Sequence, residues 1–134
     1  MEVVRRILER VLASIERGDP AAYFDPAIIA ADAEWVLTQP FEGRTVWTGP
    51  EEFVEFVRDW TEQFADWTFQ VERVIDAEDG QVVALLHQSA TGRDSGVPVE
   101  WKLGQVHELE EGRLVRVTNY FSHAEALEAA GLSE

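Results

Sequence analysis

The sequence changes its hydrophobic period once, near Trp67, and this change constrains the fold more than any other feature. Before Trp67, apolar residues recur every three or four positions in two stretches, as in amphipathic helices. From Trp67 to Phe121, apolar and polar residues alternate, as in strands with one buried face. Helices followed by a run of antiparallel strands predict an α+β fold in a single domain over residues 1–134.

The first helix is predicted from "VVRRILERVLASIERGDP", which ends at Gly18, Asp19 and Pro20. Its apolar stripe consists of Val4, Ile7, Leu8, Val11, Leu12 and Ile15. A shorter helical piece is expected over residues 20–24, and a short strand over residues 33–41. Both have breakers beside them, because Asp25 precedes Pro26 and the strand meets Pro40.

A second helix is predicted within "TVWTGPEEFVEFVRDWTEQF". Thr48 is its expected N-cap, Pro50 suits the first turn, and Glu51 completes a capping box with Thr48. Its buried stripe is predicted to contain Phe53, Phe56, Val57, Trp60 and Phe64.

Four strands are predicted near residues 67–77, 81–92, 97–109 and 113–121, joined by the turns "AEDG", "GRDSG" and "EEG". A last helix begins at Ser122, where Glu125 completes a second capping box, and ends at Gly131. A long bent sheet with helices on one face tends to form a cone, whose wide end holds a pocket when side chains leave it open.

Charge and composition exclude several classes of function. The net charge of −15 opposes binding to nucleic acids or anionic membranes. The chain has no cysteine, and we expect neither a metal nor a cofactor. It shows no membrane-spanning run or signal-peptide pattern, so we expect a cytoplasmic protein.

Several segments along nearly the whole chain resemble the nuclear transport factor 2-like superfamily, and above all its SnoaL-like branch. They include "ADAEWVL", "TGPEEFVEFVRDW", "SGVPV" and the most specific one, "EEGRLVRVTNYFSHAEALEAAGL". The resemblance implies a strongly curved, mostly antiparallel sheet wrapped around N-terminal helices, with an internal pocket. The superfamily includes polyketide cyclases, ketosteroid isomerases, limonene-epoxide hydrolases and non-enzymatic binding domains, so function depends on the pocket lining.

Functional positions of these families fall on particular residues of this chain. The resemblance places the aspartate of the epoxide-hydrolase motif "RDYFD" at Asn119, and that family's arginine and aspartate near Leu85 and His87. The protonated aspartate of the isomerases falls near Gln105. A neutral polar set of His87, Gln105 and Asn119 therefore takes the place of the catalytic acids.

Two further isomerase positions also depart from the family pattern. The general-base aspartate falls near Leu37 and the catalytic tyrosine near Val11, and neither side chain can transfer a proton.

Period-two alternation predicts which strand residues face the cone. One inward row contains Val83, Leu85, His87 and Ser89, a second contains Trp101, Leu103, Gln105 and His107, and a third contains Val115, Val117, Asn119 and Phe121. The outer face is then apolar, with Val82, Ala84, Leu86 and Val106 exposed. Because such a face is too apolar for water, we expect a homodimer formed through the sheet.

Two functions of the pocket remain open, beside a third interpretation in which the protein is a purely structural dimer that uses its exposed sheet face. The first is a binding protein for a small, largely apolar or carbonyl-bearing molecule. Its expected ligand-binding residues are Trp35, Trp60, Trp101, Tyr23, Leu85, Leu103, Val117 and Phe121. The second is a cofactor-free isomerase, cyclase or hydrolase, with His87 as general acid and base and with Gln105 and Asn119 as hydrogen-bond donors. Alternatively, these three polar residues bond to one another or to water inside a closed core.

Overall fold

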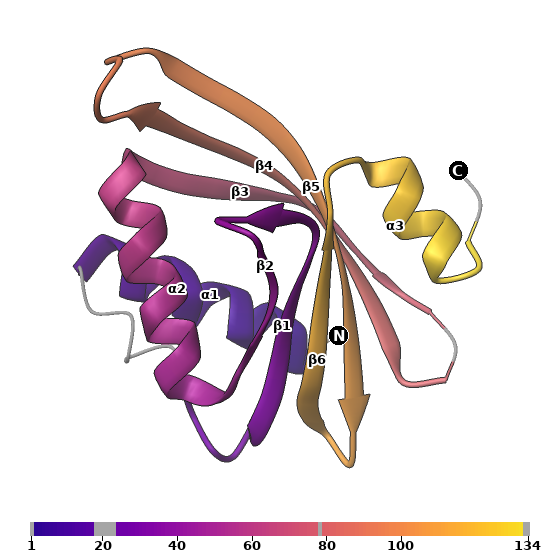
Figure 1. Cartoon of the computed structure of the whole chain (residues 1–134). Coiled ribbons are helices and arrows are strands. Elements are labelled where there is room, and N and C mark those ends of the chain that lie inside the picture. The colour runs from indigo at the N-terminus through magenta and orange to yellow at the C-terminus, as the bar shows by residue number, and fades with distance from the viewer. Residues whose placement is uncertain (1, 18–23, 78, 133–134) are drawn as a thin grey trace.

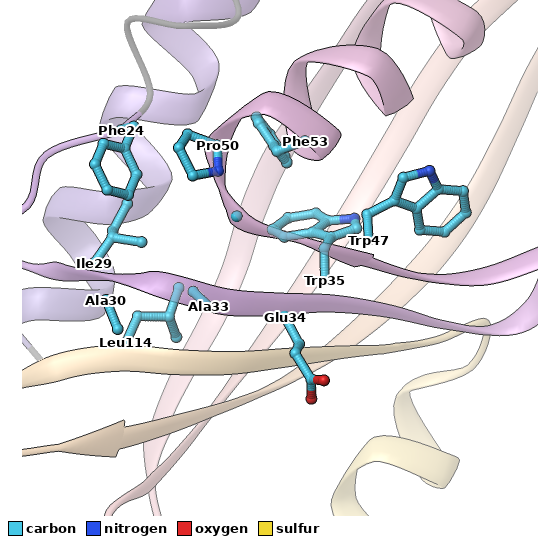
Figure 2. Close-up of a pocket in the computed structure, with 11 residues that line it drawn as sticks. Phe24, Ile29, Ala30, Ala33, Glu34, Trp35, Trp47, Pro50, Phe53 and Leu114 are labelled. Carbon is cyan, nitrogen blue, oxygen red and sulfur yellow. The ribbon is translucent and has the colours of Figure 1, made fainter.

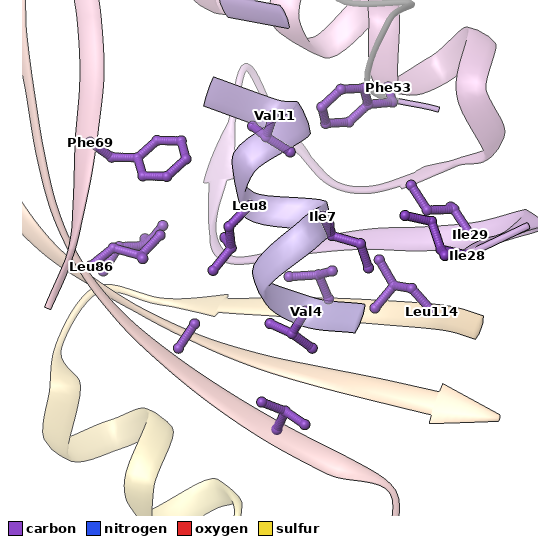
Figure 3. Packing of buried hydrophobic residues seen from close by; sticks show 14 of the residues in the cluster. Val4, Ile7, Leu8, Val11, Ile28, Ile29, Phe53, Phe69, Leu86 and Leu114 are labelled. Carbon is purple, nitrogen blue, oxygen red and sulfur yellow. The ribbon is translucent and has the colours of Figure 1, made fainter. Parts of the chain in front are cut away.

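The apolar stripe of the first helix packs into the concave side of a curved sheet. The structure is a computed structural model that describes residues 2–17, 24–77 and 79–132. Helix α1 (Glu2–Arg17) buries Val4, Ile7, Leu8 and Val11 against the sheet, as predicted (Figure 3). The side chain of Ile15 and the predicted helical piece up to residue 23 lie outside the described part.

The sheet confirms the predicted α+β class. Its strands are β1 (Ile29–Phe41), β2 (Arg44–Thr48), β3 (Phe64–Asp76), β4 (Gln81–Gly92), β5 (Pro98–Glu110) and β6 (Arg113–Tyr120). They lie in the order β2-β1-β6-β5-β4-β3, with β1 parallel to β6 and the other pairs antiparallel. Strand β2 was not predicted, and β1 begins earlier than expected because Ile29 pairs with Leu114 of β6.

Helix α2 (Gly49–Gln63) also lies on the concave side, whereas α3 (His123–Ala129) lies on the convex side (Figure 1). Phe53, Phe56 and Val57 of the predicted stripe of α2 are buried and Trp60 is half-buried, but Phe64 is the first residue of β3. The predicted capping box is wrong. The Thr48 side chain makes no capping bond, and the backbone N–H of Thr48 donates to Glu52 Oε1 at 2.8 Å. Glu52 takes the place of Glu51 because its carboxylate also pairs with Arg44.

Helix α3 has the predicted cap and sits directly on the sheet. Ser122 Oγ accepts a hydrogen bond from the Glu125 backbone N–H at 3.1 Å. A Cβ atom placed on Gly104 of β5 would lie 2.5 Å from the Cβ of Ala126, so only glycine allows this close approach. Among the described helices, none is long and apolar enough to cross a membrane.

The imidazole of His123 provides a second anchor for α3. Its Nε2 donates to the carbonyl oxygen of Leu86 at 3.0 Å. Leu86 lies where β3 bulges between Val71 and Arg73, so the regular ladder is interrupted beside this carbonyl. The histidine thus supplies a donor to a buried strand at an irregular position.

The side chains of β4 point to the opposite sides of the sheet from those predicted. Val82, Ala84 and Leu86 belong to the large concave core, whereas Val83 and Leu85 belong to a smaller core beneath α3. Because helices cover both faces, the segment "VVALL" is apolar throughout and its pattern does not define a register.

The predicted outer apolar face therefore does not exist in the form expected. Val82, Ala84 and Leu86 are inside the cone, and Val106 is buried in the core beneath α3. The homodimer stays a prediction, without these residues to support it.

Candidate functional site

A hollow lies between the second half of α2 and the concave face of the sheet. We call it the aromatic pocket, and its described lining consists of Trp35, Leu37, Phe56, Trp60, Trp67, Gln88, Trp101, Leu103, Asn119 and Phe121. It measures about 330 Å³ including its open side, of which about 30 Å³ admits the centre of a water molecule. The side chains therefore leave room for a few waters, and a larger molecule requires some of them to rotate.

Trp60 of α2 is the centre of the aromatic wall. Its ring centroid lies 5.7 Å from that of Trp67 and 5.8 Å from that of Trp101, on strands β3 and β5. Helical and strand elements thus converge here through tilted and edge-on rings. The indole Nε1 of Trp60 is buried and has no hydrogen-bond partner among the described residues. A buried donor of this kind favours a bound acceptor, either water or a ligand.

Two carboxamides supply the polar part of the lining. Gln88 of β4 is 6% exposed, and its Oε1 accepts a long hydrogen bond from Trp67 Nε1 at 3.4 Å. Asn119 of β6 is 1% exposed. Gln88 was not predicted as a lining residue, because the expected register of β4 turned it away from the cone.

Asn119 belongs to a chain of hydrogen bonds that leads away from the pocket. Its Nδ2 donates to the carbonyl oxygen of Val36 at 2.9 Å, and its Oδ1 accepts from Gln105 Nε2 at 2.9 Å. Gln105 Oε1 lies 2.9 Å from Nε2 of His107. Asn119 therefore both lines the pocket and satisfies buried polar groups.

His107 takes the position in this network that we predicted for His87. The pair Gln105 and His107 is two residues apart on β5, so both side chains face inward. Burial lowers the pKa of His107 to about 3, because a charged imidazole loses its hydration. His107 is thus neutral at physiological pH. The alternation of β5 contained this signal, since it placed His107 in the same row as Gln105.

The prediction that His87 faces the pocket is wrong. Alternation along β4 turns it to the convex side, opposite to Gln88, and its Nε2 lies 3.5 Å from the Glu100 carboxylate. Its side chain is 31% exposed. His87 and His107 therefore face opposite sides of the sheet.

The predicted ligand-binding residues are divided between three locations. The pocket lining includes Trp35, Trp60, Trp101, Leu103 and Phe121, whose binding roles stay predictions. Two other predicted residues are elsewhere: Leu85 is beneath α3, and Val117 is wholly buried in the concave core. Tyr23 lies outside the described residues.

A second hollow lies between β1 and the beginning of α2 (Figure 2). Trp35, Trp47, Phe53 and Pro50 surround it, and it measures about 310 Å³ including open space. Glu34 points to the other side of β1 from Trp35 (Figure 2), where it binds Arg116 at 2.7 Å. Trp35 lines both hollows, so its indole forms part of the wall between them.

Comparisons with solved structures show what fold this chain shares. It resembles a nuclear transport factor 2-like protein of unknown function from Burkholderia pseudomallei, with 20% identity, a TM-score of 0.74, and coverage of 97% of this chain and 98% of that one. It also resembles a protein of ketosteroid isomerase-like fold from Catenulispora acidiphila in complex with trimethylamine, at 15% identity and a TM-score of 0.71, covering 95% and 93% of the two chains.

A third similar structure is a proposed SnoaL-like polyketide cyclase from a Jannaschia species, with 13% identity, a TM-score of 0.70, and coverage of 99% and 94%. No protein of curated function gives a significant match to the sequence. The sequence profile of the SnoaL-like domain matches residues 8–117, which include α2 and most of the sheet. The chain therefore belongs to the SnoaL-like domain family.

Proposed function

We propose that the aromatic pocket binds a small, largely apolar molecule, and that the protein is a binding protein of SnoaL-like fold. The observation that carries this proposal is the composition of the lining: six aromatic side chains, two aliphatic ones and two carboxamides. Apolar walls with a few oriented polar groups are typical of small-molecule sites. The buried Nε1 of Trp60, without a partner among the described residues, adds a donor that a ligand oxygen can use.

Binding fits this lining better than acid–base catalysis. None of the ten described residues that line the pocket has a side chain that titrates near neutral pH. The buried His107 is held neutral by desolvation and bonds to Gln105, not to the pocket. The base predicted for the enzymatic alternative, His87, lies on the convex side.

The ligand that fits best has one ring or two. The volume of about 330 Å³ includes open space, so the enclosed part of the hollow is smaller than this figure. A ligand must therefore displace part of the half-buried wall. Trp101 and Phe121 are half-buried lining residues, and rotation of either would enlarge the pocket.

Tryptophan fluorescence offers a direct test, because four of the five tryptophans line this pocket. We expect acetophenone and ethylbenzene to change the emission and raise the melting temperature of the wild type. Asn119→Leu should weaken the binding of acetophenone, whereas the matched control His87→Ala should not change it.

Two results would contradict the proposal. One is the absence of binding for every aromatic probe at concentrations near its solubility limit. The other is equal binding to the wild type and to Trp60→Ala, checked to be folded by circular dichroism, because Trp60 forms the centre of the wall. Conversion of a bound ketone, followed by NMR and lost in Asn119→Leu, would favour an enzyme over a binding protein.

A further inference from the structure

Asn119, Gln105 and His107 form a buried chain of hydrogen bonds in which each amide can point its nitrogen or its oxygen toward its neighbour. We call this donor-to-acceptor order the direction of the chain. It controls which atom Asn119 offers to a ligand. We propose that His107 is a positioning residue: through Gln105 it holds the carboxamide of Asn119 so that the aromatic pocket is offered an N–H donor and not an acceptor. The inference rests on the proposed function insofar as it concerns the ligand. The orientation itself can be measured without one.

The Val36 end of the chain fixes the first orientation. A backbone carbonyl oxygen can only accept, so the atom of Asn119 that lies 2.9 Å from it must be the amide nitrogen. Asn119 Oδ1 then faces Gln105, whose amide nitrogen donates to it at 2.9 Å. Reversing Asn119 would bring two oxygens together at Val36, which is unfavourable in a buried site.

The His107 end favours the same direction. With Gln105 Nε2 bound to Asn119, Gln105 Oε1 faces His107 and requires a donor, which assigns the proton of the imidazole to Nε2. Nδ1 is then a lone pair, and it has no hydrogen-bond partner among the described residues. In the reversed chain Nδ1 would carry a buried N–H without a partner, and orphaned donors are rarer than orphaned acceptors.

The Val36 carbonyl at one end of the chain and His107 at the other therefore each favour the same arrangement of the hydrogen bonds between them. An amide nitrogen carries two N–H groups, and the bond to Val36 uses one of those on Asn119. Gln88 has the same polarity, because its Oε1 is bound by Trp67 and its amide nitrogen is left to donate. The polar side chains of the lining are thus held as donors, and the matching ligand carries an oxygen acceptor on an apolar frame.

The proton position of His107 tests the inference without a ligand. Ring-nitrogen NMR of ¹⁵N-labelled protein, assigned by comparison with His107→Gln, should show protonated Nε2 and unprotonated Nδ1 from pH 8 to pH 5. A protonated Nδ1 in this range would overturn the inference, since it requires the reversed chain. This result does not depend on whether the pocket binds anything.

The ligand arm compares two probes of similar shape, acetophenone and ethylbenzene, which differ by one carbonyl oxygen. Wild type should bind acetophenone about threefold to tenfold more tightly than ethylbenzene, the range expected for one net hydrogen bond. His107→Leu should lower this ratio while leaving the affinity for ethylbenzene unchanged. It should not abolish the preference, because Trp60 Nε1 and the Gln88 amide nitrogen remain as donors. His107→Gln should keep the ratio, because its amide nitrogen reaches a similar position to imidazole Nε2 and can donate to Gln105.

The outcomes separate the inference from the proposed function. If neither probe binds the wild type, the proposed function fails, and the tautomer of His107 still decides the direction of the chain. If both bind but His107→Leu keeps the full ratio, His107 does not position Asn119. An equal loss of affinity for both probes in His107→Leu would mean a merely structural role, and would also overturn the inference.

Discussion

The two faces of the sheet differ in what they enclose. The concave face holds the large core around α1 and α2, the buried chain from Asn119 to His107, and the aromatic pocket. The convex face holds a small apolar core closed by the seven-residue helix α3, which is seated on Gly104. Strands β4 and β5 contribute residues to both cores. On the concave face, the wide space between helices and sheet accommodates buried polar side chains and a pocket. On the convex face, α3 lies so close to the sheet that apolar side chains fill the space between them.

The largest expected effect compares neighbouring leucines of β4. Leu86 is 1% exposed in the concave core, and Leu85 is 6% exposed beneath α3. We expect Leu86→Ala to lower the free energy of unfolding by about 4 kcal/mol and Leu85→Ala by about 2 kcal/mol, because the short helix can settle into the smaller gap. Urea unfolding of both variants measures this difference. Equal losses would mean that the two cores respond alike to a cavity.

The second effect is a loss of stability in acid, and it arises from His107 on the concave face. The pKa of His107 is about 3 in the folded state and 6.5 in its ordinary state. Since the unfolded chain binds the proton more readily, stability is complete above the ordinary pKa and falls as the pH drops toward 3. Relative to His107→Gln, the wild type should lose about 2.5 kcal/mol between pH 7.5 and pH 4.5. The same loss in both proteins would contradict a buried neutral imidazole.

A smaller effect compares the caps of the two helices that lie on opposite faces. Ser122→Ala should lower the stability by about 1 kcal/mol, because Ser122 Oγ accepts from the Glu125 backbone N–H. Thr48→Ala should cost less than about 0.5 kcal/mol, because Thr48 makes no side-chain capping bond and its N–H is bound by Glu52. Thermal unfolding of the pair at one pH provides the measurement. A larger loss for Thr48→Ala would reverse the assignment of the caps.

The smallest effect is expected for the surface pair on the convex side. His87→Ala removes the contact with Glu100, and exposed pairs of this kind contribute about 0–1 kcal/mol. We therefore expect nearly unchanged stability and unchanged affinity for acetophenone. A marked loss of affinity at unchanged stability would place His87 near the ligand, and would break the division between the two faces.

Much of the fold could be predicted because the local signals agreed with each other. Alternation along β5 and β6 placed Gln105 and Asn119 inward, and the structure joins them at 2.9 Å. Ser122 and Glu125 marked the start of α3. In these segments polar residues occur regularly enough to distinguish the two faces, so period two defines the register.

Other features could not be predicted, because they depend on what packs against each segment. In β4 both faces are covered, so the neighbours His87 and Gln88 were equally plausible inward residues. Strand β2 exists because Val46 and Trp47 pair with Val36 and Trp35 of β1. Glu52 displaced Glu51 at the α2 cap because Arg44 holds its carboxylate.

By itself, the sequence determined the class of the fold, the order of most of its elements, and the inward direction of Gln105 on β5 and of Val117 and Asn119 on β6. Local periodicity and capping are enough for these, because each depends on neighbours along the chain. The predicted inward direction of Val115 is wrong, because Leu114 takes that place in the concave core. Tertiary structure alone decided that Gln88 and not His87 enters the cone, and that the inward-facing His107 hydrogen-bonds to Gln105, which in turn bonds to Asn119. Those choices depend on which helix covers which face of a strand, and that coverage arises only when distant segments pack together.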